Sequence, residues 1–515
     1  MSTTTIRLSV EDWGPIEEGS VEIRPLTIFI GPNNTGKSYL AMLFYSLALA
    51  ISKLSGSFRF VRRRKRLRSE LEGMVSALID AYLEKKSRDL TEELGSLLSE
   101  ALSAEIASRL PVVLREELER VYSSRVGALV RLGSAEARMK LAVSSPLLEF
   151  LMASEVTPED KLELEELKLS VKQSLIKGCM KLIDLYLFFP RRRVEPKISK
   201  AVIRKELEKV APELVWRLTW RFEATIRAAL RDALFGGNIH YLPASRAGIL
   251  HSYRSIARAL ISLAPIAPVR GVEIPGIPGP LADFLGELIL MGHEPEEEGP
   301  IKAIARSLER EVLEGEVALL RQPPEAPPAL VFKFDGGSLP IAMASSMIAE
   351  AAPLSILLKY GTVRPGDTLI VEEPEAHLHP DKQAKLAILL AKLVNEAGVR
   401  LLITTHSDVL LAKLSNLVSL SAIPPDEARE LGHDPSAALP PEKVAVYSFE
   451  PGPGGVRVVP VKVTEEGIPD EVFRRVLERL YEETMDLYYR LQASRGARRG
   501  HGGAEGGGGA EGRAG

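Results

Sequence analysis

Gly31-Pro-Asn-Asn-Thr-Gly-Lys-Ser38 is the stretch that decides the fold of this 515-residue chain. It lies between two apolar runs, of which Leu26 to Ile30 has the composition of a buried strand and residues 39–51 that of a buried helix. A strand, a glycine-rich loop and a helix in this order form the context that a phosphate-binding loop requires. The alternative is a plain strand-to-helix turn that matches the pattern by chance, and the two correct flanks disfavour it.

The residue types in this stretch suit the binding of a phosphate. Gly31 and Gly36 let the backbone bend, so that the loop amides and the positive end of the following helix point at one anion. Lys37 is expected to reach the β- and γ-phosphates of a nucleotide, and Ser38 to give its hydroxyl to Mg²⁺. The predicted nucleotide-binding residues of the loop are Gly31, Pro32, Asn33, Asn34, Thr35, Gly36, Lys37 and Ser38.

Composition limits the other function classes. The 66 Lys and Arg residues nearly balance the 69 Asp and Glu residues, giving a net charge of -3, so any contact with nucleic acid must come from local patches. The single cysteine, Cys179, excludes an intramolecular disulfide framework and a cysteine-rich zinc site, and a reducing cytoplasm is the expected location. The longest apolar stretch, residues 39–51, is too short to span a bilayer, and no signal peptide is recognised. We therefore expect no membrane association.

The start of the chain resembles a known family. Thr5 to Val10 alternates like a strand, a turn with the sequence EDWGPI follows, and a second strand pair leads into the phosphate loop. This order resembles the nucleotide-binding heads of ABC-class ATPases of the chromosome-maintenance, RecF and OLD type. The resemblance implies an α/β P-loop NTPase fold with a mixed central sheet and an antiparallel β-subdomain. It also implies binding of ATP with Mg²⁺, and no guanine-recognition motif N-K-x-D follows the loop.

An acidic pair ends the next buried strand. Residues 368–371 are apolar and lead into Glu372 and Glu373, an arrangement that in a chain with a phosphate loop indicates a Walker B element. By resemblance, Glu372 is assigned to the metal and Glu373 to the base that polarises the attacking water. Most relatives have aspartate at the first position, so the longer Glu372 leaves the coordination geometry open and slow hydrolysis is one outcome.

Two further positions follow from the resemblance. His406, at the tip of the strand formed by residues 400–404, matches the switch histidine that hydrogen-bonds the γ-phosphate. Ser345 or Ser346, at the start of a helical run, matches the signature serine that binds the γ-phosphate held by a partner subunit, and Ser346 is the residue we assign. Met347 stands where the family has glycine, and the alternative for the serines is an ordinary helix cap.

Two histidines near the acidic pair admit a second interpretation. His377 and His379, with Glu375, offer ligand types that zinc prefers. They fall in a turn with no further ligand nearby, and the resemblance assigns this segment to a loop that contacts the partner subunit. We favour the partner loop over a metal site.

The middle of the chain has a different amino-acid composition. Residues 52–236 are rich in charged and leucine residues with helical spacing, and we expect a large helical insertion there, although residues 161–171 alternate like a strand or hairpin. The expected parts are 1–51, the first part of the ATPase head; 52–236, the insertion; 237–465, the second part of the head; 466–493, a C-terminal helix; and 494–515, a disordered glycine-rich tail.

Basic clusters in the insertion suggest a possible nucleic-acid contact. Arginines beside aromatic residues can grip phosphate backbones, and the alternative is a solvated helix face paired with glutamates. The candidate DNA-contacting residues are Arg62, Arg63, Arg64, Arg66, Arg191, Arg192 and Arg193. Outside the insertion, Arg246 in the segment LPASR is a candidate for the nucleotide or the dimer face, or else a surface arginine in a turn.

Together these features predict Mg²⁺-dependent hydrolysis of ATP by a head that forms a homodimer around nucleotide. Relatives of this kind serve in DNA repair, chromosome handling and defence, and the sequence does not choose among them. The alternative function is a nucleotide-gated clamp or sensor that binds DNA or protein with negligible turnover.

Overall fold

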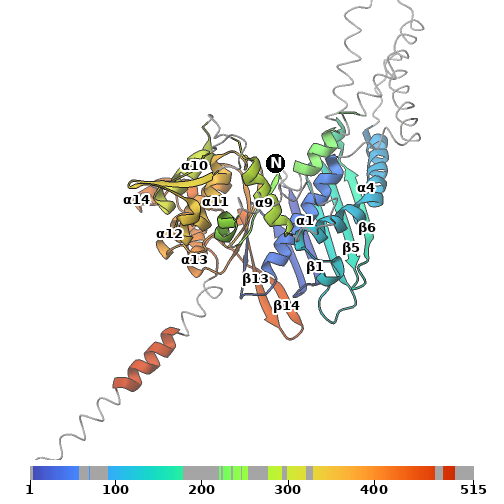
Figure 1. Ribbon diagram of the computed structural model, residues 1–515. Coiled ribbons are helices and arrows are strands. Elements are labelled where there is room, and N and C mark those ends of the chain that lie inside the picture. The colour runs from blue at the N-terminus through green and yellow to red at the C-terminus, as the bar shows by residue number, and fades with distance from the viewer. Residues whose placement is uncertain are drawn as a thin grey trace, which may run out of the picture.

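The computed structural model describes residues 4–56, 69, 73, 91–177, 220–221, 224–232, 236–244, 246–252, 277–292, 298–320, 329–469 and 480–492. Within these residues, one large mixed sheet forms the centre of the molecule (Figure 1). Its strands, in the order in which they lie side by side, are β6 (Leu162–Val171), β5 (Leu148–Val156), β4 (Ala137–Ser144), β1 (Thr5–Trp13), β2 (Ile16–Ile23), β14 (Gly455–Val461), β13 (Val444–Gly452), β3 (Leu26–Ile30), β12 (Arg400–Thr405), β11 (Thr368–Glu372) and β7 (Ile239–Leu242).

One half of the sheet is parallel and includes the strand that precedes the phosphate loop. β13, β3, β12, β11 and β7 pair in parallel with one another in that order. β12 lies between β3 and β11, so the strand that leads to the phosphate loop and the strand that ends in the acidic pair are separated by one strand. The carboxyl ends of parallel strands meet at one edge of a sheet, which is where α/β proteins bind ligands.

The parallel strands β3, β11 and β12 are mostly apolar and almost wholly buried because both faces of the sheet are covered. In β3, for example, Ile28 belongs to one buried cluster of side chains and Phe29 to the other, and the same alternation holds in β11, β12 and β13. Strands buried on both faces are near-continuous apolar runs in sequence. This is why residues 26–30, 368–371 and 400–404 could be recognised as strands.

The helices divide between the two faces of the sheet. One cluster contains side chains of α1 and α4, and the other those of α9 to α13 (Figure 1). The helices are α1 (Lys37–Gly56), α4 (Thr91–Tyr122), α9 (Gly279–Leu290), α10 (Pro300–Leu308), α11 (Ser346–Lys359), α12 (Pro380–Asn395), α13 (Asp408–Leu420) and α14 (Pro425–Glu430).

The other half of the sheet is antiparallel, and part of it corrects a prediction. We expected residues 52–236 to be a helical insertion, but this is wrong for residues 137–171, which form β4, β5 and β6 and extend the sheet from β1. Their side chains alternate between buried and exposed, with Met139 and Leu141 of β4 facing the core that α1 and α4 cover. A strand with one covered face has this period of two. From the sequence we predict this alternation only for residues 161–171, where β6 is found.

The α/β fold class is confirmed, including its antiparallel subdomain, which comes from β1, β2 and β4 to β6. A second, three-stranded antiparallel sheet consists of β8 (Glu316–Leu320), β9 (Ala329–Phe334) and β10 (Gly337–Pro340). Residues 480–492 are helical and largely exposed, within the helix that we expected near the C-terminus. Among the described helices, none has the length and apolar character that a membrane span needs. The division into domains otherwise remains a prediction.

A buried charged cluster fixes the opposite, amino-terminal edge of the parallel strands. His240 of β7 is 6% exposed, with Nδ1 2.7 Å from a carboxylate oxygen of Glu287 on α9 and Nε2 3.1 Å from one of Asp367, which precedes β11. Burial acts to lower the pKa of His240, but hydrogen bonds to Asp367 and Glu287 outweigh it and raise the pKa to about 9. The imidazolium therefore ties α9 to two strands.

We predict that His240 makes stability depend on pH. Because its pKa is raised on folding, its contribution is fully present below about pH 6.5 and is lost as the pH rises through about 9. A shift of this size corresponds to about 3 kcal/mol. The difference in unfolding free energy between wild type and His240→Asn, measured by urea denaturation, should therefore be largest near pH 6 and shrink by pH 9.5. His251→Asn, at an exposed histidine, is the control, and a difference that is independent of pH would contradict the assignment.

Candidate functional site

The phosphate loop requires its two glycines. Gly31 has φ +137° and Gly36 φ +92°, values that residues with a side chain rarely adopt. A Cβ at Gly31 would lie 2.6 Å from the carbonyl oxygen of Phe449, and one at Gly36 would lie 2.8 Å from side-chain carbons of Pro15 and Ile16. Both the backbone conformation and the close neighbours therefore make any other residue strained at these two positions.

Lys37 lies inside the loop. The residue is 5% exposed, and its Nζ donates hydrogen bonds to the carbonyl oxygens of Gly31 (2.9 Å) and Pro32 (2.7 Å). Burial lowers the pKa of Lys37 to about 8, and the nearby Glu373 carboxylate opposes this effect. Thr35 donates its hydroxyl to the carbonyl of Pro32 at 2.8 Å, which closes the loop from within.

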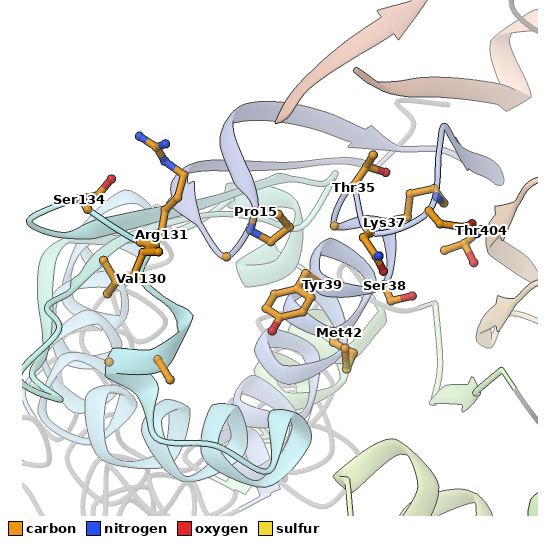
Figure 2. A pocket seen from close by; sticks show the side chains of 18 of the residues that line it. Pro15, Thr35, Lys37, Ser38, Tyr39, Met42, Val130, Arg131, Ser134 and Thr404 are labelled. Carbon is orange, nitrogen blue, oxygen red and sulfur yellow. The ribbon is translucent and has the colours of Figure 1, made fainter. Parts of the chain in front are cut away.

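A cavity of about 980 Å³ opens over the loop. Figure 2 shows Lys37, Ser38 and Thr404 at one end of it. The other predicted residues that line it are Asn33, Asn34, Thr35, Gly36, Glu373 and His406. These residues come from the loop after β3 and from the ends of β11 and β12, so the structure brings the loop, the proposed base and the proposed switch histidine to one space.

Glu373 is held in an uncommon backbone conformation. Its φ is +43°, and its amide donates to the carbonyl oxygen of Thr404 at 2.9 Å, which fixes the residue against the end of β12. Its carboxylate is 44% exposed and lies 3.7 Å from Nε2 of His406. Non-glycine residues in such strained conformations cluster at functional sites.

His406 is positioned by Glu375. One carboxylate oxygen of Glu375 accepts hydrogen bonds from the hydroxyl of Thr405 (2.6 Å) and from the amide of His406 (3.1 Å). Burial and then the charge of Lys37 lower the pKa of His406, so the neutral imidazole is favoured. The sequence places Glu375 in the predicted partner loop or zinc alternative and does not reveal its contact with the His406 segment, because these partners lie about 30 residues away along the chain.

Glu372 has a different environment from the one expected of a metal ligand. Its residue is 8% exposed, and its two carboxylate oxygens accept hydrogen bonds from the hydroxyl of Tyr241 (2.8 Å) and the amide of Ala244 (2.9 Å). It is not among the residues that line the cavity. By contrast, Ser38 and Glu373 line the same space, and a hydroxyl and a carboxylate are the oxygen donors that Mg²⁺ takes beside phosphate oxygens. The donor set at the cavity therefore fits Mg²⁺.

Ser346 lies away from this cavity. It is the first residue of α11, while Ser345 is the N-cap, whose hydroxyl accepts from the amide of Ile348 at 3.4 Å. Both serines are exposed, and neither lines the cavity of its own chain.

The zinc alternative gains no support in the described part of the chain, where no group of three or more His, Cys, Asp or Glu residues could hold a metal ion. His377 and His379 are exposed, and His379 hydrogen-bonds Asp381. The two basic clusters, residues 62–66 and 191–193, lie outside the described residues. A surface position for Arg246 is wrong, because this residue is 1% exposed.

The far wall of the cavity was missed by sequence reasoning. It consists of Tyr39 and Met42 on α1 and of residues 127–134, between α4 and β4, which include Arg131 (Figure 2). The amide of Arg131 donates to the carbonyl of Asp12 at 2.8 Å, and its side chain contacts Asp12 and Gly454. No motif marks residues 127–134, because only the pairing of β4 with β1 brings them to the loop.

Comparison with known proteins agrees with this geometry. Residues 293–411 match the family model described as AAA ATPase domain, a segment that includes the acidic pair and His406. Residues 293–411 are therefore similar to an AAA ATPase domain. Together with the phosphate loop and the mixed sheet, this similarity supports the sequence resemblance to ABC-class P-loop ATPases.

Solved structures similar to this chain include an SMC head bound to the C-terminal winged-helix domain of ScpA, with 11% identity, a TM-score of 0.40 and coverage of 90% of this chain and 98% of that one. The SMC head domain of Thermotoga maritima has 10% identity, a TM-score of 0.35 and coverage of 89% and 99%. A Pyrococcus furiosus SMC head with an extended coiled coil, bound to the C-terminal domain of ScpA, has 11% identity, a TM-score of 0.35 and coverage of 95% and 100%. No curated protein sequence matches the chain.

We predict that Gly36→Ala weakens nucleotide binding without unfolding the protein. Strain of about 1 to 3 kcal/mol at a left-handed position corresponds to roughly a 5- to 150-fold loss of affinity. Titration with a fluorescent ATP analogue measures it, and circular dichroism checks the fold. Gly286→Ala is the matched control, because a Cβ there meets no atom within 4 Å. Equal affinities for both variants would contradict the role given to the loop.

Proposed function

We propose that this protein hydrolyses ATP with Mg²⁺ in the cavity over residues 31–38. The observation that supports the proposal is the convergence of Lys37, Glu373 and His406 on that single cavity. A phosphate loop, a carboxylate and a neutral imidazole around one space are the groups that in-line attack of water on a γ-phosphate requires. The base of the nucleotide is proposed as adenine from the family resemblance.

Each group has a distinct proposed role. Lys37 leaves its loop carbonyls to neutralise the β- and γ-phosphates, and the loop amides orient them. Glu373 accepts a hydrogen bond from the attacking water and polarises it, while His406 donates to a γ-phosphate oxygen. Bound Mg²⁺, held by Ser38, would supply charge neutralisation between the phosphates. Glu372 would act on the metal indirectly, since its oxygens are engaged by Tyr241 and Ala244.

We also propose that two copies pair around nucleotide. Ser346 is exposed and does not line the cavity of its own chain, so it can complete a site only in a second copy. The amino-terminal end of α11 and the Ser346 hydroxyl offer donors suited to a γ-phosphate. The family resemblance gives this serine the same role.

A second candidate function, a nucleotide-gated clamp with negligible turnover, is favoured by one observation. The engagement of both Glu372 oxygens within the chain leaves the expected metal carboxylate with reduced capacity for coordination. In either function, DNA is the proposed partner through Arg62, Arg63, Arg64, Arg66, Arg191, Arg192 and Arg193, and the proposed setting is DNA maintenance or defence in the cytoplasm.

Two substitutions should separate binding from turnover. Lys37→Ala removes a charged hydrogen-bond donor and should weaken ATP binding by about 100-fold. Glu373→Gln should leave binding intact and lower kcat by about 100-fold or more, because it removes the base. Phosphate release and equilibrium binding are measured for both, with and without double-stranded DNA.

The controls are Lys333→Ala and Glu427→Gln, at exposed residues outside the cavity. Tight ATP binding without phosphate release in the wild type would refute hydrolysis and favour the clamp. Stimulation by DNA would support the proposed partner.

Pairing has its own test. Ser346→Glu places a negative charge where a partner's γ-phosphate would approach, yet glutamate is favourable in the first turn of a helix. With ATP bound, Glu373→Gln should sediment as a dimer, whereas the double variant Glu373→Gln/Ser346→Glu should stay monomeric with unchanged affinity for ATP. A Glu373→Gln protein that is loaded with ATP and still monomeric would rule out pairing.

A further inference from the structure

Arg246 is a fully buried arginine beside the proposed catalytic carboxylate. It lies in the short segment after β7, is 1% exposed and is among the largest side chains with so little exposure. Buried arginines are costly unless every donor is paired. The partners of this side chain therefore show what the fold uses it for.

The guanidinium contacts the main chain of the acidic pair. Nη1 donates to the carbonyl oxygen of Glu372 at 2.6 Å, and Nη2 donates to that of Glu373 at 2.9 Å. Nε donates to the carbonyl oxygen of Glu350 on α11 at 2.8 Å and lies 3.3 Å from its carboxylate. One planar group thus joins the end of β11 to the first turns of α11.

Glu350 completes this arrangement from the other side. Its carboxylate oxygens accept from the amides of Arg246 (2.9 Å) and Ala247 (3.1 Å), so the acid holds the segment on which the arginine lies. The residue is 4% exposed, and its charge compensates the buried guanidinium. It follows Ser346 by about one turn of α11, so the same contacts connect the start of that helix with the acidic pair.

The contacts of Arg246 hold Glu373, the residue whose backbone is strained. Glu373 has φ +43° and Pro374 after it has no amide to donate, so the regular ladder of β11 ends at Glu373, whose carbonyl accepts from the amide of Ala376 at 3.0 Å. Thr404 fixes its amide from β12, and Arg246 fixes the two carbonyls on either side of its Cα. The direction of the Glu373 side chain follows from these three hydrogen bonds.

We propose that Arg246 is a positioning residue for ATP hydrolysis. The two Nη groups of its guanidinium hold the carbonyls of Glu372 and Glu373, and these orient Glu373 toward the cavity. Glu350 in turn holds the guanidinium through Nε. This proposal rests on the proposed function, in which Glu373 polarises water. Arg246 is 1% exposed and is not among the residues that line the cavity. Its loss should therefore lower kcat without changing the affinity for ATP.

The test uses a double variant that removes both buried charges. Arg246→Met alone leaves Glu350 without its counter-charge, whereas Arg246→Met/Glu350→Gln leaves no unpaired charge and keeps an acceptor for the two amides. Displacement of a catalytic group by about 1 Å costs roughly 100-fold in rate. We expect the double variant to fold, to bind ATP within about threefold of wild type, a margin well below the tenfold that 1.4 kcal/mol represents, and to lose kcat by that factor.

A matched control lies on the same helix. Lys359 and Glu309 form another buried ion pair, at 3.3 Å, and neither contacts the acidic pair. Lys359→Met/Glu309→Gln should lower stability as the first double variant does, yet keep kcat. A similar loss of kcat in both double variants would show that Arg246 contributes only to stability and would overturn the proposal.

Arg246→Lys provides an independent variant in case the double variant does not fold. Lysine keeps the charge beside Glu350, but a single ammonium lacks the fork that reaches both carbonyls. It should fold and still show a lowered kcat with unchanged affinity for ATP. A kcat equal to that of wild type would overturn the proposal.

Hydrogen exchange separates failure of this proposal from failure of hydrolysis itself. The amide of Glu373 donates to the carbonyl of Thr404, and the amide of Ala376 donates to the carbonyl of Glu373. Without Arg246, both amides should exchange faster than in the Lys359→Met/Glu309→Gln protein. The amides of α12 should exchange at an unchanged rate. This readout needs no turnover. Faster exchange in a protein whose wild type hydrolyses no ATP would support positioning and refute hydrolysis, whereas unchanged exchange would overturn positioning whatever the ATPase result.

Discussion

The parallel register of three strands is the constraint on which the site depends. Thr404 of β12 lies opposite both Phe29 of β3 and Glu372 of β11, so the three strands end at one level. A slip of one residue would exchange the two faces of a strand, and with both faces packed against helices that exchange would disrupt two cores at once. The apolar packing on the two faces therefore sets where Lys37, Glu373 and His406 meet. The geometry of the proposed site is thus a consequence of core packing.

The antiparallel half of the sheet contributes more than a cover for α1. By pairing with β1, β4 brings residues 127–134 over the phosphate loop, and Arg131 hydrogen-bonds Asp12 near the end of β1. The cavity therefore has one wall from the parallel half and one from the antiparallel half. The two halves share α1, whose first residues belong to the loop and whose later residues pack on α4. Any change in how they pack would alter the space over residues 31–38.

The elements of the site were predictable from the sequence, but only part of their arrangement was. The glycines at 31 and 36 and the apolar runs beside them are local signals, because left-handed backbone and strands buried on both faces leave their mark within a few residues. The roles of Tyr241, Glu350 and Glu375 depend on contacts across 30 to 131 residues of chain, which no local pattern encodes. Residues 137–171 were assigned to a helical insertion because the charge and leucine content of their neighbours outweighed an alternation that was present. The fold class was predictable; the partners of the buried charges were not.

The charged side chains at and beside the cavity differ in how firmly they are held. Arg246, Glu350 and Glu375 are held by main-chain groups and have little freedom, whereas Glu373 is 44% exposed and faces Lys37 and His406. Groups fixed by hydrogen bonds lose little entropy when a ligand binds, and a group left partly solvated can change its partners. Strain at Glu373 persists because the surrounding hydrogen bonds determine its backbone from three directions. Among these four residues, the fold thus concentrates rigidity in the three that do not line the cavity and leaves adjustment to Glu373, which does.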